Sequence, residues 1–309
     1  MRVFYIEASD VHSFYTFVLS TITDFMLKKK MKIMLKIMLM AAVVLSGTAF
    51  AQNENVFVFN TKSPSMQKEI PATIVLPDSY KTQKETFPVI YLLHGHGGNH
   101  AGWAKHTQPQ LQKLATQHNI IFVCPDGANS WYWDSPIDPK LKYETYITKE
   151  LIPQIDAKFN TVKNRKGRAI IGFSMGGHGA LYLAINHQDL FGACGSLSGG
   201  VDIRPFPNNW HMANSLGEYS KNKEVWDSHT VMEQLYKIKP NSLAITIDCG
   251  VKDFFYQVNE ELHQRLLYLN IPHDYTTRPG AHTHEYWGNA IRFQTVFFDE
   301  YFKKQNVKK

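Results

Sequence analysis

One serine lies between two glycines in a stretch whose residue types could support nucleophilic chemistry. The stretch reads Gly172-Phe173-Ser174-Met175-Gly176-Gly177, follows the mostly apolar run 168–171 and precedes an alanine- and leucine-rich segment. This context predicts a strand, a tight turn and a helix, because glycines remove the side chains that would collide in such a turn. The turn raises the hydroxyl above the sheet, and the new helix directs free backbone N–H groups to the same place. A purely structural glycine-rich turn is the alternative to a nucleophile at Ser174.

A serine hydroxyl is a weak nucleophile and needs a base within hydrogen-bond reach, which a third group orients. Asp253 lies a few residues after the apolar run 243–247, and His282 follows the strand-like run 273–277. Both therefore belong to loops at the edge of the sheet where Ser174 is expected to emerge. The order serine, acid, histidine is the order found in α/β-hydrolases. These positions predict a catalytic triad of Ser174, Asp253 and His282.

Each partner has a rival nearby in the sequence. Asp248 lies inside its strand-like run and is interpreted as a structural carboxylate at a strand end. His284 is two residues beyond His282 and closer to the final helix, where we expect it to cap or pack. An ordinary structural role is the better prediction for any single histidine, so the hypothesis depends on three residues in the right order.

The reaction also needs backbone donors for the oxyanion that develops on the substrate carbonyl. One donor is expected from the residue after the nucleophile, which is Met175, and the other from a loop after an early strand. His94-Gly95-His96-Gly97-Gly98 follows the apolar run 88–93 and can supply the second donor. The N–H of His96 or Gly97 is the candidate, since glycines let the backbone approach a substrate closely.

Histidines in the same stretch allow a different interpretation, because H-x-H pairs bind metals. The candidate zinc ligands are His94, His96, His100, His282 and His284. Their spacing lacks the carboxylate–histidine continuation of dizinc hydrolases, and a metal site would leave the turn at Ser174 without a purpose. We therefore expect neither a metal nor an organic cofactor.

Aromatic residues cluster after the apolar run 120–124. Trp131, Tyr132 and Trp133, followed by Asp134, are placed there to form a stacking wall for a sugar or a phenolic acid. Ordinary loop packing is an equally good interpretation, because tryptophan is highly buried on average.

Strand-like and helix-like segments alternate after residue 52, with no internal repeat or linker between them. Alternation of this kind predicts an α/β fold of the α/β-hydrolase type, with a mostly parallel central sheet and helices on both faces. Ligands bind such sheets beyond the carboxyl ends of the strands, which is where the candidate residues lie. The expected strands are 56–59, 70–76, 88–93, 120–124, the run before Ser174, 191–197, 243–247 and 273–277, and the expected helices are 143–159, 175–185, 257–269 and the segment 286–301.

The first 51 residues form an upstream extension and a secretory signal peptide in this interpretation. Lysines 28–30 and 32 precede the apolar stretch 33–44, which only Lys36 interrupts, and Ala49-Phe50-Ala51 matches the small-x-small cleavage signature. Met31 would give the usual compact start, so the true initiator is expected there. A retained N-terminal anchor is the alternative.

Residues 52–309 are then a single catalytic domain of an exported protein, periplasmic or secreted. The net charge of +6 is reduced when the lysine-rich leader is removed, and the remaining lysines and arginines are scattered, so no nucleic-acid partner is expected. Cys124, Cys194 and Cys249 lie in or beside apolar runs and are expected to be unpaired core residues. Oligomeric state is left open.

Five segments together resemble an esterase family of α/β-hydrolases that includes S-formylglutathione hydrolase (esterase D), tributyrin esterases, feruloyl esterases and mycolyltransferases. They are residues 76–80, 91–98, 172–177, 249–254 and 282–287. The resemblance covers essentially the whole chain after the leader and implies the same triad of Ser174, Asp253 and His282. A tryptophan often stands in the family where this chain has His284, which affects the pocket wall rather than the triad.

The resemblance implies a serine esterase that acts on small-molecule or carbohydrate esters, and the expected signal peptide implies that it is exported. The signal peptide argues against cytosolic S-formylglutathione hydrolysis, and exported relatives commonly remove feruloyl or acetyl groups from plant polysaccharides. Two alternatives remain: an acyltransferase that uses the same triad, and a non-catalytic carbohydrate-binding relative. The fold by itself does not identify the substrate, since it hosts many ester chemistries.

Overall fold

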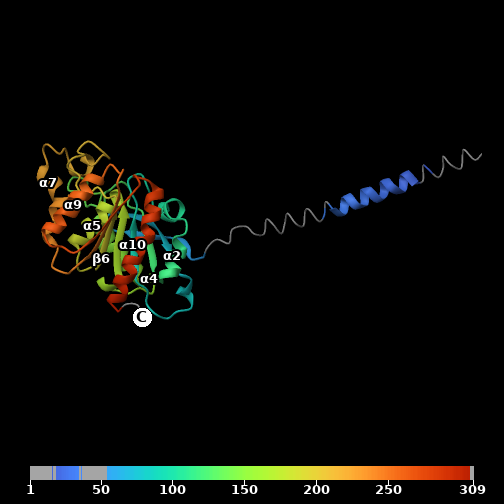
Figure 1. Cartoon of the computed structure of the whole chain (residues 1–309), viewed down its shortest axis with the longest axis horizontal. Helices are drawn as coiled ribbons and strands as arrows, with labels where there is room; N and C mark the ends of the chain where they lie inside the picture. Colours follow the sequence, from blue (N-terminus) through green and yellow to red (C-terminus); the bar gives the residue numbers. More distant parts are fainter. Residues whose placement is uncertain (1–15, 17–18, 35, 37–53, 307–309) are drawn as a thin grey trace, which may run out of the picture. The chain divides into compact units, whose positions relative to one another are not determined.

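The structure is a computed structural model that describes residues 16, 19–34, 36 and 54–306. The chain divides into two compact units, Met1–Glu54 and Asn55–Lys309. In the first unit, residues 19–34 are helical (Figure 1) and exposed. Lys28 pairs there with Asp24 at 2.6 Å. The predicted cleavage site at Ala49–Ala51 lies outside the described residues. Among the helices described, none is both long and apolar enough to cross a membrane.

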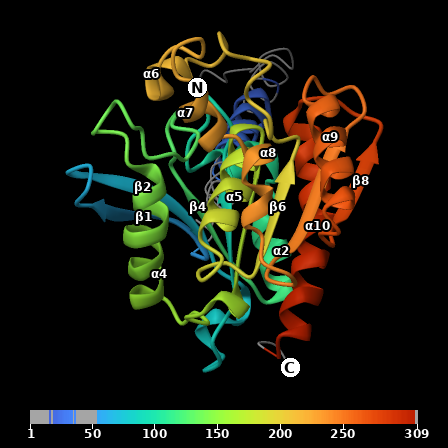
Figure 2. The ribbon, with the colours of Figure 1, turned by 90° about the vertical axis from the view of Figure 1, so that its left-hand side faces the viewer.

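Within residues 54–306, eight strands form one sheet in the order β1-β2-β4-β3-β5-β6-β7-β8. β1 and β2 pair antiparallel, as do β2 and β4, and all the other neighbours pair parallel. β1 and β2 lie at one side of the domain and β8 lies at the other (Figure 2). The α/β-hydrolase fold class is therefore confirmed. The strands are β1 (Val56–Ser63), β2 (Lys68–Val75), β3 (Val89–Leu93), β4 (Ile121–Pro125), β5 (Arg168–Phe173), β6 (Ala193–Leu197), β7 (Ala244–Gly250) and β8 (Asp274–Arg278).

Every residue of the central strands β3, β4, β5 and β6 is buried. Strands buried on both faces read as continuous apolar runs, which explains why the sequence predicts them. Successive residues alternate between two cores: Tyr91 and Leu93 belong to one, and Ile90 and Leu92 belong to the other. Both faces of the sheet are thus covered.

Helices from different parts of the chain cover the two faces. α2 (Leu111–His118) and α10 (His284–Lys304) contribute to the core with Ile90. α5 (Met175–Asn186) and α9 (Tyr256–Tyr268) contribute to the core with Tyr91. The expected helix 143–159 is present there as three consecutive pieces, with a π-helical middle: α3 (Tyr143–Thr145), η3 (Tyr146–Leu151) and α4 (Ile152–Lys158).

The segment between β6 and β7 contains short helices that the periodicity did not predict. They are α6 (Ala213–Leu216), α7 (Lys223–Ser228) and α8 (Val231–Gln234). The sequence also did not predict η2 (Trp103–Thr107) and α2, which lie between β3 and β4. Arg204 ties this segment together through ion pairs to Asp202 at 2.7 Å and Glu233 at 2.5 Å. A partly buried guanidinium with several carboxylate partners fixes an irregular segment that has little regular hydrogen bonding of its own.

The three cysteines are buried and unpaired, as expected. Burial raises the pKa of each thiol, so none of them is a reactive thiolate at neutral pH.

Candidate active site

Ser174 occupies a strained turn between β5 and α5, with φ 57° and ψ −122°. The two flanking glycines are required by the surrounding backbone. A Cβ atom on Gly172 would lie 2.7 Å from the carbonyl oxygen of Leu93, and one on Gly176 would lie 2.6 Å from that of His94. The Gly-x-Ser-x-Gly spacing thus lets β3, β5 and α5 come together beneath the serine.

The structure brings Ser174, His282 and Asp253 into one hydrogen-bonded row. His282 Nε2 lies 2.9 Å from Ser174 Oγ, and His282 Nδ1 lies 2.9 Å from Asp253 Oδ2 and 3.0 Å from Asp253 Oδ1. Because a carboxylate only accepts hydrogen bonds, Nδ1 carries the proton and Nε2 presents its lone pair to the serine hydroxyl. The three side chains come from loops after β5, β7 and β8, which are at the same edge of the sheet.

Aromatic rings enclose the His282 imidazole. The ring centroids of Phe254, Trp287 and Phe255 lie 4.1, 4.7 and 5.6 Å from that of His282, and Trp287 presents a perpendicular ring. The side chain of Asp253 is fully buried behind the imidazole and accepts the N–H of Phe255 at 2.8 Å. These contacts fix the orientation of both groups and exclude water from the carboxylate.

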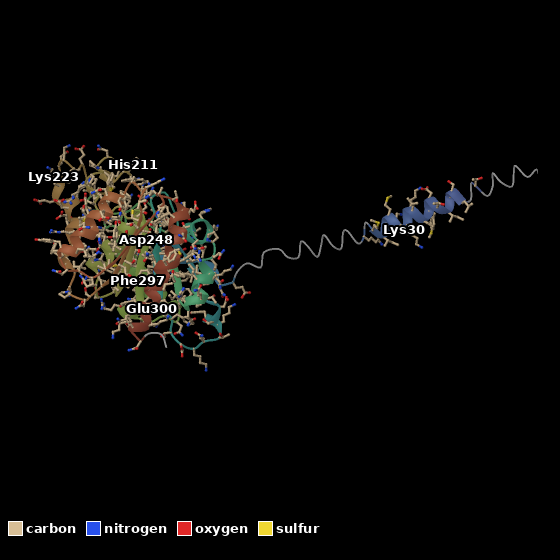
Figure 3. All side chains as sticks on the ribbon, in the orientation of Figure 1. Lys30, His211, Lys223, Asp248, Phe297 and Glu300 are labelled. Atoms are coloured by element: carbon tan, nitrogen blue, oxygen red, sulfur yellow. The ribbon has the colours of Figure 1, made fainter. Side chains whose placement is uncertain are left out.

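The rival residues have other partners. Asp248, labelled in Figure 3, is buried inside β7. It accepts hydrogen bonds from Tyr286 Oη at 2.6 Å and Gln294 Nε2 at 2.9 Å and pairs with Arg278. It joins β7, β8 and α10 rather than contacting His282. His284 begins α10 and its Nδ1 lies 2.8 Å from Thr107 Oγ1, so its ring packs at the edge of the site.

Two backbone N–H groups near Ser174 are free to donate to a substrate. Met175 is the first residue of α5, so its N–H has no acceptor inside the helix. The loop after β3 approaches closely, because a Cβ on Gly95 would lie 3.2 Å from Ser174 Cβ. Asn129 Oδ1 takes the Gly97 N–H at 2.7 Å, whereas the described residues offer the His96 N–H no acceptor. Of the two loop donors considered from the sequence, His96 is therefore the available one.

The chain is similar in sequence to a known protein family. The family model described as Putative esterase matches residues 63–295. The chain belongs to this family. It is 31% identical over 235 residues to an esterase of Mycobacterium tuberculosis, an alignment covering 68% of this chain and 51% of the relative. The chain thus spans about half the length of that relative.

Two further similar proteins are matched over nearly their whole length. The acetyl esterase of Caldicellulosiruptor saccharolyticus is 25% identical over 253 residues, covering 75% of this chain and 93% of the relative. A solved ferulic acid esterase structure has a TM-score of 0.68 and 27% identity, covering 80% of this chain and 98% of the other. The resemblance stated from the sequence is confirmed by these similarities.

In this chain, a cleft of about 260 Å³ opens beside Ser174 and His282. Its apolar wall consists of Phe173, Trp210, Phe254 and Trp287, and the loop 94–98 forms another side. The Trp210 and Phe254 rings stack with centroids 6.0 Å apart. Phe254 is 54% exposed, so this pair stands at the mouth of the cleft.

The predicted stacking wall of Trp131, Tyr132 and Trp133 is wrong. These three side chains are at most 2% exposed and do not line the cleft. Trp133 Nε1 donates to His178 Nε2 at 3.0 Å, and Tyr132 Oη donates to the His94 carbonyl at 3.0 Å. The loop folds inward beneath the site, because three large rings gain more from burial in the core than from the cleft surface.

Residues that line the cleft instead were missed for identifiable reasons. Trp210 belongs to the irregular segment between β6 and β7, where no periodicity points to the site. Phe254 directly follows Asp253, and Trp287 follows His282 by five residues, so adjacency to the predicted triad was an available signal.

Four of the five histidines considered as zinc ligands hydrogen-bond to protein groups, whereas the buried Nε2 of His96 has no hydrogen-bond partner among the described residues. His94 Nε2 accepts the N–H of Gly127 at 2.8 Å, and its Nδ1 donates to the Gly95 carbonyl at 2.8 Å. His100 Nδ1 lies 2.9 Å from Thr73 Oγ1. Among the residues that the structure describes, no group of three or more His, Cys, Asp or Glu side chains could hold a metal ion.

Proposed function

We propose that this chain is a carboxylic ester hydrolase that uses Ser174 as its nucleophile. The observation that carries the proposal is the His282 imidazole, which contacts Ser174 Oγ at 2.9 Å and Asp253 at 2.9 Å on its opposite nitrogens. Membership of the esterase family and the oxyanion donors beside the serine support it.

Acylation begins when Ser174 Oγ attacks the ester carbonyl and His282 Nε2 accepts the hydroxyl proton. The His96 and Met175 N–H groups stabilise the negative charge that develops on the carbonyl oxygen. His282 then gives the proton to the leaving alcohol oxygen, and the serine ester remains.

Deacylation repeats the sequence with water in place of the alcohol. His282 takes a proton from water, the hydroxide attacks the acyl carbonyl, and the proton returns to Ser174 Oγ as the acid leaves. Asp253 keeps the proton on Nδ1 and stabilises the imidazolium in both steps.

The substrate we propose is an acyl group on a carbohydrate, with feruloyl and acetyl groups as the candidates. The acetyl esterase and ferulic acid esterase relatives support these two acyl types. The stacked Trp210 and Phe254 rings offer a surface for an aromatic acyl group. Export by the N-terminal leader is part of this proposal, since polysaccharide substrates lie outside the cell.

Two variants test the chemistry. Ser174→Ala should abolish hydrolysis of acetyl, butyryl and feruloyl esters, and Asp253→Asn should lower kcat by about 10³–10⁴-fold because the imidazole loses its orienting carboxylate. Both variants should keep the wild-type circular dichroism spectrum. Unchanged ester turnover by the Ser174→Ala variant would refute the proposed nucleophile.

A further inference from the structure

A second hollow lies on the other side of one wall of the catalytic cleft. It has a volume of about 410 Å³ and lies between α2 with its preceding loop and the first turns of α10. We call it the α2–α10 groove, defined by Thr107, Gln108, Gln110, Lys113, Leu114, Gln117, Glu285, Gly288, Asn289 and Arg292. None of these residues takes part in the proposed triad or oxyanion hole.

The groove and the cleft share a wall, and residues of η2 and α10 form it. Thr107 lines the groove, and its Oγ1 lies 2.8 Å from Nδ1 of His284, which lines the cleft. Consecutive residues of α10 do the same, since Trp287 faces the cleft and Gly288 faces the groove. A ligand that extends from Ser174 over the Thr107–His284 contact therefore reaches the groove.

Close packing keeps this partition in place. Gln108 Nε2 donates to the Gly288 carbonyl at 2.7 Å, and its side chain is mostly buried. A Cβ on Gly288 would collide with the carbonyl oxygen of Thr107, so α10 lies directly against η2 at this point. The floor of the groove is therefore preorganised, which lowers the entropy cost of binding a ligand.

The chemistry of the groove suits a polyhydroxylated ligand. Six of its side chains make no side-chain hydrogen bond or ion pair with another described residue: Gln110, Lys113, Gln117, Glu285, Asn289 and Arg292. Three of them are amides, which donate and accept as sugar hydroxyls do. Leu114 is the one apolar side chain lining the groove, so an acyl chain would gain little burial there.

We propose that the α2–α10 groove is the subsite for the carbohydrate alcohol of the ester, while the aromatic cleft holds the acyl group. This inference rests on the proposed function and extends it. Two cations against one carboxylate also make the groove suitable for uronic acid substituents on the sugar chain, because the excess charge is positive.

The first test compares two feruloyl esters that differ only in their alcohol. The variant Gln117→Ala/Asn289→Ala/Arg292→Ala removes exposed side chains and is measured on methyl ferulate and on a feruloylated arabinoxylo-oligosaccharide. The ratio of kcat/KM for the oligosaccharide to that for methyl ferulate should fall about tenfold, mainly through KM, because hydrogen bonds to the sugar are lost. An unchanged ratio would overturn the subsite.

Lys223→Ala is the matched control, because Lys223 is an exposed cation that lines a different polar hollow at the periphery of the domain (Figure 3). This control should keep the wild-type ratio. An equal fall in the control would show a general charge effect and would also overturn the subsite.

A binding measurement separates failure of the subsite from failure of the proposed chemistry. Calorimetric titration of the Ser174→Ala protein with the unesterified oligosaccharide needs no turnover. Binding that weakens about tenfold in the groove variant supports the subsite even if wild-type protein cleaves neither ester, which would refute the proposed function alone. Equal affinity of both proteins for the oligosaccharide would refute the subsite.

Discussion

At the scale of residues, the site depends on one imidazole whose two nitrogens have different partners. Asp253 holds the proton of His282 at Nδ1, and this leaves the lone pair on Nε2 directed at Ser174. Rings of Phe254 and Trp287 prevent the imidazole from turning away. Hydrogen bonding sets the tautomer here and packing sets the orientation, so both are needed for proton transfer.

Trp210 is the residue we expect to set acyl preference. Trp210→Ala removes a ring that stacks on Phe254, so kcat/KM for a feruloyl ester should fall about tenfold more than kcat/KM for an acetyl ester, as expected for a lost aromatic contact. Steady-state kinetics with 4-nitrophenyl acetate and methyl ferulate measure the difference.

Tyr236→Ala is the control for this prediction, because Tyr236 is 77% exposed and does not line the cleft. It should leave both rates unchanged. Equal losses on the two esters in the Trp210→Ala variant would show that the ring supports the fold rather than the acyl group.

At the scale of elements, the site is a junction of strand ends and one helix start. β5 delivers the serine, β7 the aspartate and β8 the histidine, and α5 supplies the Met175 N–H. Parallel strands bring their carboxyl ends to the same edge, so residues 174, 253 and 282 meet although they lie far apart in sequence. The junction tolerates no side chain where β3 passes beneath the turn.

Gly176→Ala tests this close approach. The added Cβ would lie 2.6 Å from the His94 carbonyl, so we expect the free energy of unfolding to fall by about 1–3 kcal/mol through overpacking. Ester turnover should fall as well, because the His96 donor lies on the displaced loop. Urea denaturation measures the first effect.

Gly102→Ala is the matched control, since its Cβ would have no atom within 4 Å and its φ is −56°. Its free energy of unfolding should stay at the wild-type value or rise slightly. Comparable stability of the two variants would contradict the proposed role of the close contact.

We expect His178 on α5 to make the free energy of unfolding depend on pH. Its Nδ1 donates to the Gly200 carbonyl and its Nε2 accepts from Trp133, so the buried ring is held neutral. Burial lowers the pKa of His178 from 6.5 to about 4. Between these values the unfolded state binds the proton more strongly, so the contribution of His178 to stability is complete above pH 6.5 and is lost as pH falls toward 4.

His178→Gln should remove this part of the pH dependence, because glutamine can replace both hydrogen bonds and does not titrate. The wild-type free energy of unfolding should fall by about 3 kcal/mol more than that of the variant between pH 7 and pH 4. Denaturation at several pH values gives both curves. Parallel curves would show that His178 is not held neutral in the folded protein.

At the scale of the whole molecule, the chain combines the unit Asn55–Lys309, which carries the site, with the unit Met1–Glu54, in which we interpret residues 1–51 as an extension and leader. The family match over residues 63–295 lies entirely in the unit Asn55–Lys309. Lysines followed by an apolar stretch and Ala-Phe-Ala are what a signal peptidase substrate requires.

Expression in an exporting bacterial host tests the leader. Protein from the periplasmic fraction should begin at Gln52, as shown by intact mass and N-terminal sequencing, and a chain that begins at Met31 should be exported equally well. Replacement of the small residue before the cut, Ala51→Trp, should block cleavage. Uncut wild-type protein in the membrane fraction would instead indicate a retained anchor.

The sequence predicted all eight strands within a few residues. The central strands were the clearest, because a strand buried on both faces is a continuous apolar run, whereas β1 and β8 are partly exposed. It did not predict α6, α7 and α8, which are short, mixed in polarity and held by contacts such as the Arg204 ion pairs. Long amphipathic helices such as α9 and α10 were found from their periodicity, and short ones were not, because one turn carries no repeat.

The chemistry of the candidate site follows from residue types and their order: a serine in a glycine turn, then an acid, then a histidine, each after an apolar run. Local backbone sterics and the geometry of parallel strands are properties of the chain itself, so the sequence alone determined where these groups would meet. Only the tertiary structure decided which side chains surround them. It buried Trp131 and Trp133, brought Trp210 to the cleft and committed the Gly97 N–H to Asn129. Those outcomes depend on packing between distant segments, and no local pattern in the sequence records which large ring gains most from burial.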